Sequence, residues 1–93
     1  MPELKLKDGK RLSAYGLACG YIEKVDCCSL YVQFYQDGCY HVRCHSIYDG
    51  RIFWLSMNSL GMARKIYRKA CKLVLNADVD GLRQLANEYK QYN

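Results

Sequence analysis

Three Asp-Gly pairs divide the first part of the chain into short β-rich runs, and they constrain the fold more than any other feature. The pairs are Asp8-Gly9, Asp37-Gly38 and Asp49-Gly50. An Asp-Gly pair is a strong hairpin signal because glycine adopts positive φ angles at no steric cost. Strands joined by such tight turns pair with their neighbours in antiparallel fashion. The chain is therefore predicted to form an antiparallel β-meander of four or five strands.

The runs around these turns alternate apolar and polar side chains, which is typical of half-buried strands. Strands are expected at residues 4–6, 10–24, 30–35, 39–47 and 51–56, with a further turn at residues 25–29. Gly16 and Gly20 predict that the long second strand bends or breaks. The face that carries Leu30, Val32 and Phe34 is the more apolar one. It is therefore the better candidate for packing against helices.

Residues 58–76 carry a strong helical pattern. When the segment is wound at about 100° per residue, apolar side chains fall on one side, and five bases and no acid fall on the other. These bases are Arg64, Lys65, Arg68, Lys69 and Lys72. Asn58 or Ser59 is the expected N-cap, because a side-chain oxygen there accepts a hydrogen bond from the first turn.

A second helix is expected at residues 78–91, with Asp78 as its N-cap and mixed charge on its outer side. Residues 1–93 then form a single α+β domain, with the sheet in residues 1–57 and both helices packed on one of its faces. The predicted core consists of Leu30, Val32, Phe34, Val42, Phe53, Leu55, Leu60, Ala63, Tyr67, Ala70 and Val74.

The chain carries a net charge of +5, and the positive excess is concentrated in its last third. Residues 1–58 hold 7 bases and 6 acids, whereas residues 59–93 hold 7 bases and 3 acids. A positive surface favours acidic partners, such as nucleic acid, a nucleoprotein or an acidic protein face. The charge argues against a protein that imitates DNA.

Six cysteines and no signal-like N-terminus predict reduced thiols in a cytoplasmic protein. Free cysteines commonly behave as small buried hydrophobic residues, and that is the expectation for this set. No run is apolar enough to span a membrane, so no membrane partner is expected.

The segment 39–45 concentrates potential metal ligands and nucleophiles. In a strand Cys39, His41 and His45 share a face while Cys44 points away, so the four cannot surround a tetrahedral zinc ion. Cys39 and His41 form a potential nucleophile pair, but the sequence supplies no third orienting group. We therefore expect no metal, no cofactor and no enzymatic activity.

The polar face of the predicted sheet is a candidate binding surface. It would carry Tyr31, Gln33, Tyr35, His41 and Arg43, which become neighbours if their strands pair through Asp37-Gly38. Aromatic side chains interleaved with bases stack on nucleobases or anchor protein interfaces. This face and the five helix bases are the predicted partner-binding residues.

In general organisation the chain resembles small accessory proteins of phages and mobile elements, including many anti-CRISPR proteins. The shared features are a compact antiparallel sheet, a strand containing Ile52-Phe53-Trp54, and a capped helix from Ser59-Leu60 through Ala63-Arg64-Lys65. The resemblance implies an inhibitor that docks on a larger nucleic-acid-handling complex. It carries over no functional residues.

The leading hypothesis is accordingly a non-enzymatic binding protein that docks on a protein complex. The alternative is a module that binds nucleic acid directly through the basic helix and the tyrosine-rich sheet face. A protein partner is favoured because five bases make few phosphate contacts unless the sheet face joins them. Self-association through a sheet edge is left open.

Overall fold

The computed structural model describes residues 21–93, which form a four-stranded antiparallel sheet followed by two helices. The strands are β1 (Tyr21–Cys27), β2 (Leu30–Asp37), β3 (Cys39–Ser46) and β4 (Gly50–Met57), paired in that order. The helices are α2 (Leu60–Leu75) and α3 (Val79–Glu88), and a short 3-10 helix, η1 (Lys90–Tyr92), follows. The predicted α+β meander is confirmed. The expected strand at residues 4–6, the Asp8-Gly9 turn and residues 10–20 of the second strand lie outside the described residues.

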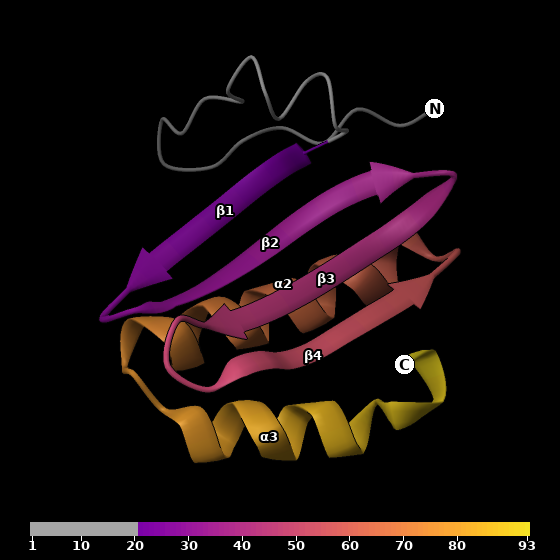
Figure 1. The fold of residues 1–93 in the computed structure, drawn as a ribbon. Helices are drawn as coiled ribbons and strands as arrows, with labels where there is room; N and C mark the ends of the chain where they lie inside the picture. Colours follow the sequence, from indigo (N-terminus) through magenta and orange to yellow (C-terminus); the bar gives the residue numbers. More distant parts are fainter. Residues whose placement is uncertain (1–20) are drawn as a thin grey trace.

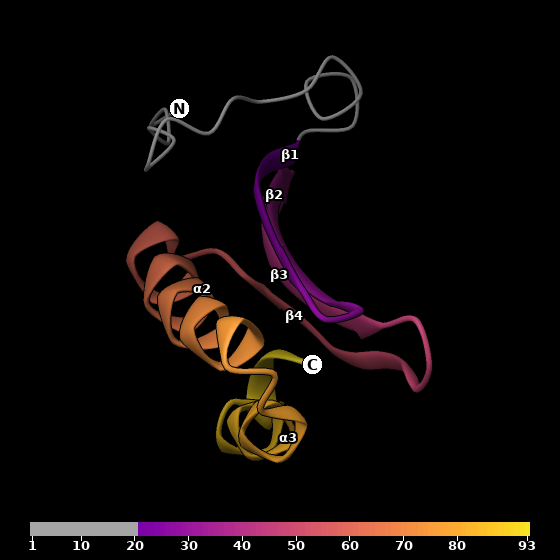
Figure 2. The same cartoon turned by 90° about the vertical axis from the view of Figure 1, so that its left-hand side faces the viewer.

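The described elements form two layers (Figures 1 and 2). Helix α2 lies across one face of the sheet and contacts all four strands, while α3 packs against α2 and β4. Both helices are therefore on the same side, as predicted. Figure 2 shows that no described element covers the opposite face of the sheet, which we call the open face.

The turns explain where the strands begin and end. Gly38 and Gly50 have φ angles of 73° and 79°, as their Asp-Gly pairs predict. The predicted turn at residues 25–29 is wrong in its extent, because β1 continues through Cys27. Cys28 and Ser29 make this turn with φ angles of 50° and 73°, a pair of positive values typical of a two-residue hairpin turn. Because neither position is glycine or asparagine, no residue pattern marks so tight a turn.

Both helices have the predicted type of N-cap. Ser59 Oγ accepts a 3.1 Å hydrogen bond from the Met62 amide, so Ser59 rather than Asn58 caps α2. Asp78 Oδ1 accepts a 2.8 Å bond from the Gly81 amide and caps α3. Each helix is slightly shorter than its predicted range, because α2 ends at Leu75 and α3 at Glu88.

The core lies between the sheet and α2. Ten of the eleven predicted core residues are buried, and Leu60 is half-buried against them. The rings of Phe34 and Tyr67 meet edge to face with centroids 5.5 Å apart, which joins β2 to α2. Burial of this apolar side fixes the orientation of α2, so its basic side must face away from the sheet.

The described cysteines are free, and only Cys44 is buried, so the expectation of a fully buried set is wrong for this part of the chain. Cys28 is exposed, while Cys27, Cys39 and Cys71 are half-buried. Within residues 21–93 the model contains no helix that is both long enough and apolar enough to cross a membrane.

Candidate functional site

Strand register brings the predicted sheet-face residues together on the open face. Tyr35 pairs with His41, and Gln33 pairs with Arg43, across the β2–β3 hairpin. Tyr31 pairs with His45 in the same ladder. Because side chains alternate along strands, these residues project from the side opposite α2. The arrangement forms one contiguous polar and aromatic surface.

Aromatic rings on this surface pack against one another in cross-strand pairs. Tyr35 and His41 stack with ring centroids 4.6 Å apart and planes 14° apart. Tyr31 and His45 stack with centroids 5.4 Å apart and planes 24° apart. Each ring restricts the side-chain rotamers of its stacked neighbour, so the surface is preorganised for binding.

Trp54 of β4 lies at the centre of the cationic part of this surface. It pairs with Arg43 in the β3–β4 ladder. The Arg43 guanidinium lies 5.3 Å from the Trp54 ring and that of Arg51 lies 5.7 Å from it. Toward the opposite edge of the sheet, the ammonium of Lys24 in β1 lies 4.9 Å from the Tyr31 ring. These distances are within the range of cation–π attraction. We call Arg43, Arg51 and Trp54, with the rings of Tyr35 and His41, the Trp54 cluster.

Arg43 Nε and His45 Nδ1 on this surface are buried without a hydrogen-bond partner among residues 21–93. Buried polar groups are nearly always hydrogen-bonded, so each exception calls for an explanation. Because both atoms are buried, they do not by themselves indicate a ligand site.

His41 contacts Cys39, the residue with which it forms the potential nucleophile pair of the sequence. Its Nε2 lies 3.5 Å from Cys39 Sγ, and its Nδ1 lies 2.7 Å from Ser56 Oγ. The Trp54 indole also donates a 3.1 Å hydrogen bond to this Nδ1. Because an indole N–H only donates, Nδ1 must accept, and the neutral ring carries its proton on Nε2. The nitrogen that faces Cys39 is therefore a donor and does not act as a base toward the thiol.

The remaining potential metal ligands are dispersed. Among the described residues no group of three or more His, Cys, Asp or Glu side chains is close enough to hold a metal ion. Cys44 points into the core, away from Cys39 and His41, as the strand alternation predicts. Burial raises the pKa of the Cys44 thiol to about 12, which makes it a poor metal ligand and nucleophile.

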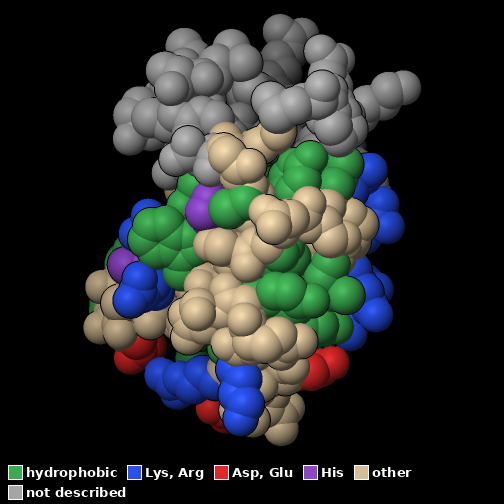
Figure 3. Space-filling view, turned by 90° about the vertical axis from the view of Figure 1, so that its right-hand side faces the viewer, with side chains coloured by type: hydrophobic (Ala, Val, Ile, Leu, Met, Phe, Trp, Pro, Cys, Tyr) green, Lys and Arg blue, Asp and Glu red, His purple; other side chains and the backbone are tan. Residues whose placement is uncertain are grey.

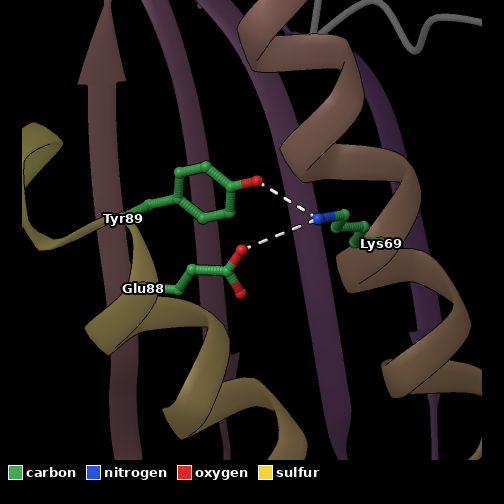
Figure 4. A network of polar contacts seen from close by, with 3 residues as sticks. All are labelled: Lys69, Glu88 and Tyr89. Carbon is green, nitrogen blue, oxygen red and sulfur yellow. Dashed lines mark hydrogen bonds and ion pairs between the residues drawn. The ribbon is translucent and has the colours of Figure 1, made fainter.

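The five bases of α2 are not equivalent. Lys65, Arg68 and Lys72 are exposed, and Arg64 is half-buried. Lys69 instead turns toward α3, where its Nζ donates a 3.2 Å hydrogen bond to the Tyr89 hydroxyl and lies 3.8 Å from Glu88 (Figure 4). The hydrogen bond with Tyr89 is the main cause of the raised pKa of Lys69. Lys69 therefore joins the two helices while its side chain stays exposed, and its predicted part in partner binding stays a prediction.

The basic side of α2 and the open face of the sheet lie on opposite sides of the protein. Figure 3 shows histidine, basic and hydrophobic side chains over the open face on the left, and a separate set of basic side chains along the helix layer on the right. A single short segment of a ligand therefore does not contact both surfaces. The prediction that the basic helix and the tyrosine-rich sheet face both bind nucleic acid is not tested by this arrangement and stays a prediction.

The predicted binding residues left out four members of the open face, namely Trp54, Arg51, His45 and Lys24, although the sequence pattern places His45 on the same strand face as His41. Counting from the Ser46–Gly50 pair at the Asp49-Gly50 turn places Phe53 rather than Trp54 opposite Arg43. A β-bulge between Cys44 and His45 shifts this register, and bulges leave little trace in a single sequence.

No protein-family model, curated protein or solved structure matches this chain. Its function is therefore inferred from its own residues and their geometry.

Proposed function

We propose that this chain is a small, non-enzymatic binding protein whose open face binds duplex nucleic acid. The observation that carries the proposal is the Trp54 cluster, in which Arg43 and Arg51 flank one aromatic ring on a sheet face that no described element covers. Tyr35 and His41 lie beside this ring and are half-buried, so polar ring atoms flank the two arginines. Arginine reads guanine edges in the major groove.

The dimensions of the sheet suit a duplex groove. Neighbouring strands lie about 4.8 Å apart, so β3 and β4 form a ribbon that is narrower than the major groove, which is about 12 Å wide. Proteins that read DNA with strands place such a ribbon in a groove and contact phosphates from its rims. Lys24 and Arg51 lie on the outer strands, where contacts to phosphates are expected.

A duplex is favoured over single strands because the faces of the aromatic rings already contact other side chains of this protein. Tyr35 stacks on His41, Tyr31 stacks on His45, and Trp54 has two guanidinium groups near its ring. Proteins that bind single strands without sequence preference offer free ring faces to successive bases. Here the surface presents mainly ring edges, hydroxyls and charges.

A second candidate function is docking on a protein, including the inhibitory role that the resemblance to anti-CRISPR proteins implies. One observation favours it: the cluster combines Trp, Tyr and Arg, the residues most enriched among the binding hot spots of protein interfaces. Its preorganised rings would also lose little entropy on docking. The partner would then be an acidic surface of a nucleic-acid-handling complex.

The test compares two double variants that remove the same charge. Anisotropy of a labelled duplex of about 20 bp measures affinity and its salt dependence for wild type, Arg43→Gln/Arg51→Gln and the control Arg83→Gln/Lys90→Gln. The control pair is exposed on the α3 side of the protein. The sheet variant is expected to lose about tenfold in affinity or more, because loss of the Arg43 contact to a base costs about 1–3 kcal/mol and loss of Arg51 removes a phosphate contact as well.

Equal losses in the two double variants would contradict the proposal, since charge alone would then explain binding. Absence of saturable duplex binding by wild type near 0.1 M salt would also contradict it. In that case, if Arg43→Gln/Arg51→Gln abolished capture of a purified protein partner, the second candidate would be supported. Matching thermal melts of all variants establish that folding is unchanged.

A further inference from the structure

We infer that the outward side of α2 is a second nucleic-acid surface, so that one chain holds two duplex segments on its opposite sides. The first segment is the one that the proposed function assigns to the open face, and the inference rests on that assignment. The second surface consists of Arg64, Lys65, Arg68 and Lys72, which we call the α2 basic row.

The orientation of this row is fixed by the core. Ala63, Ile66, Ala70 and Val74 of α2 are fully buried against the sheet, so the helix does not turn without exposing them. The basic row must therefore project away from the sheet, as the right-hand side of Figure 3 shows. A duplex on the open face leaves it free to contact something else.

The charge of the row is uncompensated. Helix α2 contains no acid, and of its five bases only Lys69 forms an ion pair within the described residues, with Glu88. Lys65, Arg68 and Lys72 are three and then four residues apart, which places them on one side of the helix over about 10 Å. A series of phosphates complements such a row along its whole length.

A protein partner suits this row less well. Tight protein interfaces depend on buried aromatic or aliphatic anchors, and beside the row α2 presents a single exposed one, Leu75, one turn after Lys72 at the end of the helix. Phosphate contacts need only positive charge and tolerate flexible side chains. The ligand that fits is therefore a nucleic-acid backbone, bound without regard to sequence.

The four bases of the α2 basic row determine how strongly binding of the second duplex should depend on salt. Each neutralised phosphate contributes about 0.9 to the slope of log affinity against log salt, so the row contributes at most about 3.6. The second contact should therefore be weak, salt-sensitive and independent of sequence. It would bring two segments together at low salt and release the second one first as salt rises.

The experiment measures energy transfer between two duplexes of about 20 bp, one carrying a donor dye and one an acceptor, at about 50 mM salt. Wild type is expected to raise the transfer at low protein-to-duplex ratios. Excess protein should lower the transfer again, because each duplex then acquires its own chain. The variants are the helix triple Lys65→Gln/Arg68→Gln/Lys72→Gln, the sheet double Arg43→Gln/Arg51→Gln and the control Arg83→Gln/Lys90→Gln.

The helix triple is expected to bind one duplex but to lose the transfer, and the control is expected to behave as wild type. Energy transfer that persists in the helix triple, or that wild type never produces, overturns the inference. A sheet double that binds and bridges like wild type instead contradicts the proposed function, so the two failures are distinguishable. Sedimentation without duplex shows whether the chain is a monomer. A dimer could instead bridge two duplexes by binding one on the open face of each chain, and such bridging would persist in the helix triple.

Discussion

The indole of Trp54 donates a hydrogen bond to Nδ1 of His41, and this contact links β4 to β3 across the open face. Ser56 Oγ lies beside the same nitrogen at 2.7 Å. Two donors therefore converge on one acceptor, which places the proton of the neutral imidazole on Nε2. The contact between the two rings makes this part of the binding surface rigid. It also leaves the nitrogen that faces Cys39 protonated, so that nitrogen does not accept the proton of the thiol.

This tautomer predicts that His41 does not activate Cys39. In an activated cysteine–histidine pair, loss of the histidine slows alkylation of the thiol by about tenfold or more. Here His41→Ala should leave the iodoacetamide rate of Cys39 undiminished, as followed by mass spectrometry of the Cys39 peptide. A strong decrease in that rate would show that the pair is catalytically competent.

Gly81 and Gly61 form a matched pair of helical glycines with opposite predicted responses to alanine. A Cβ at Gly81 would lie 2.6 Å from Asp78 Oδ2 and 2.8 Å from Leu73 Cδ2, whereas at Gly61 the nearest atom is Ser59 Oγ at 3.9 Å. Moving the Asp78 carboxylate would disturb the α3 cap. Gly81→Ala should therefore lower the free energy of unfolding by about 1–2 kcal/mol.

Gly61→Ala should instead raise the free energy of unfolding, by up to about 1 kcal/mol, because alanine is the better helix former. Urea unfolding of both variants beside wild type measures the two changes. If Gly81→Ala were as stable as Gly61→Ala, the close packing of Asp78 and Leu73 around Gly81 would be wrong.

Burial of Cys44 predicts that stability falls at alkaline pH. The pKa of this thiol is about 12 in the folded protein, against an ordinary value of 9.0. Above pH 9 the unfolded chain loses this proton while the folded protein keeps it, so stability is complete below pH 9 and declines as pH rises toward 12. At pH 10 Cys44 alone should cost about 1.4 kcal/mol.

The measurement is urea unfolding at pH 7 and pH 10 for wild type and Cys44→Ala. The variant should be less stable at both pH values, because it leaves a small cavity, but its loss between them should be smaller by about the predicted amount. An identical loss in both proteins would show that Cys44 does not titrate in this way. Tyr67, whose pKa burial also raises, titrates equally in both.

The sequence predicted the meander and the core because their signals are local. Asp37-Gly38 and Asp49-Gly50 mark turns directly, and alternation along β3 separates Val42 and Cys44 from His41 and Arg43. The Cys28-Ser29 turn carries no such residue signature, so the end of β1 was misplaced. The strand boundaries were therefore predicted correctly where the local residue pattern is strong.

The candidate site was predicted less completely because it depends on contacts between distant residues. Lys69 has the sequence pattern of a solvent-exposed base, and only the packing of α3 beside α2 shows that it meets Glu88 and Tyr89. Arg51 and Trp54 are close in sequence, but residues three apart in a regular strand point to opposite faces, and the irregular register of β3 and β4 places both beside the same surface. No single-sequence pattern specifies either tertiary contact.

Trp54 is the only tryptophan in the chain, and it lies within the proposed binding surface, so its fluorescence reports on the central claim directly. Titration with unlabelled duplex should shift or quench Trp54 emission and saturate at the affinity measured by anisotropy. The helix triple variant should retain this change, because its substitutions lie on the other side of the protein. Saturable duplex binding that leaves Trp54 emission unchanged would contradict the claim that the open face is the nucleic-acid-binding surface.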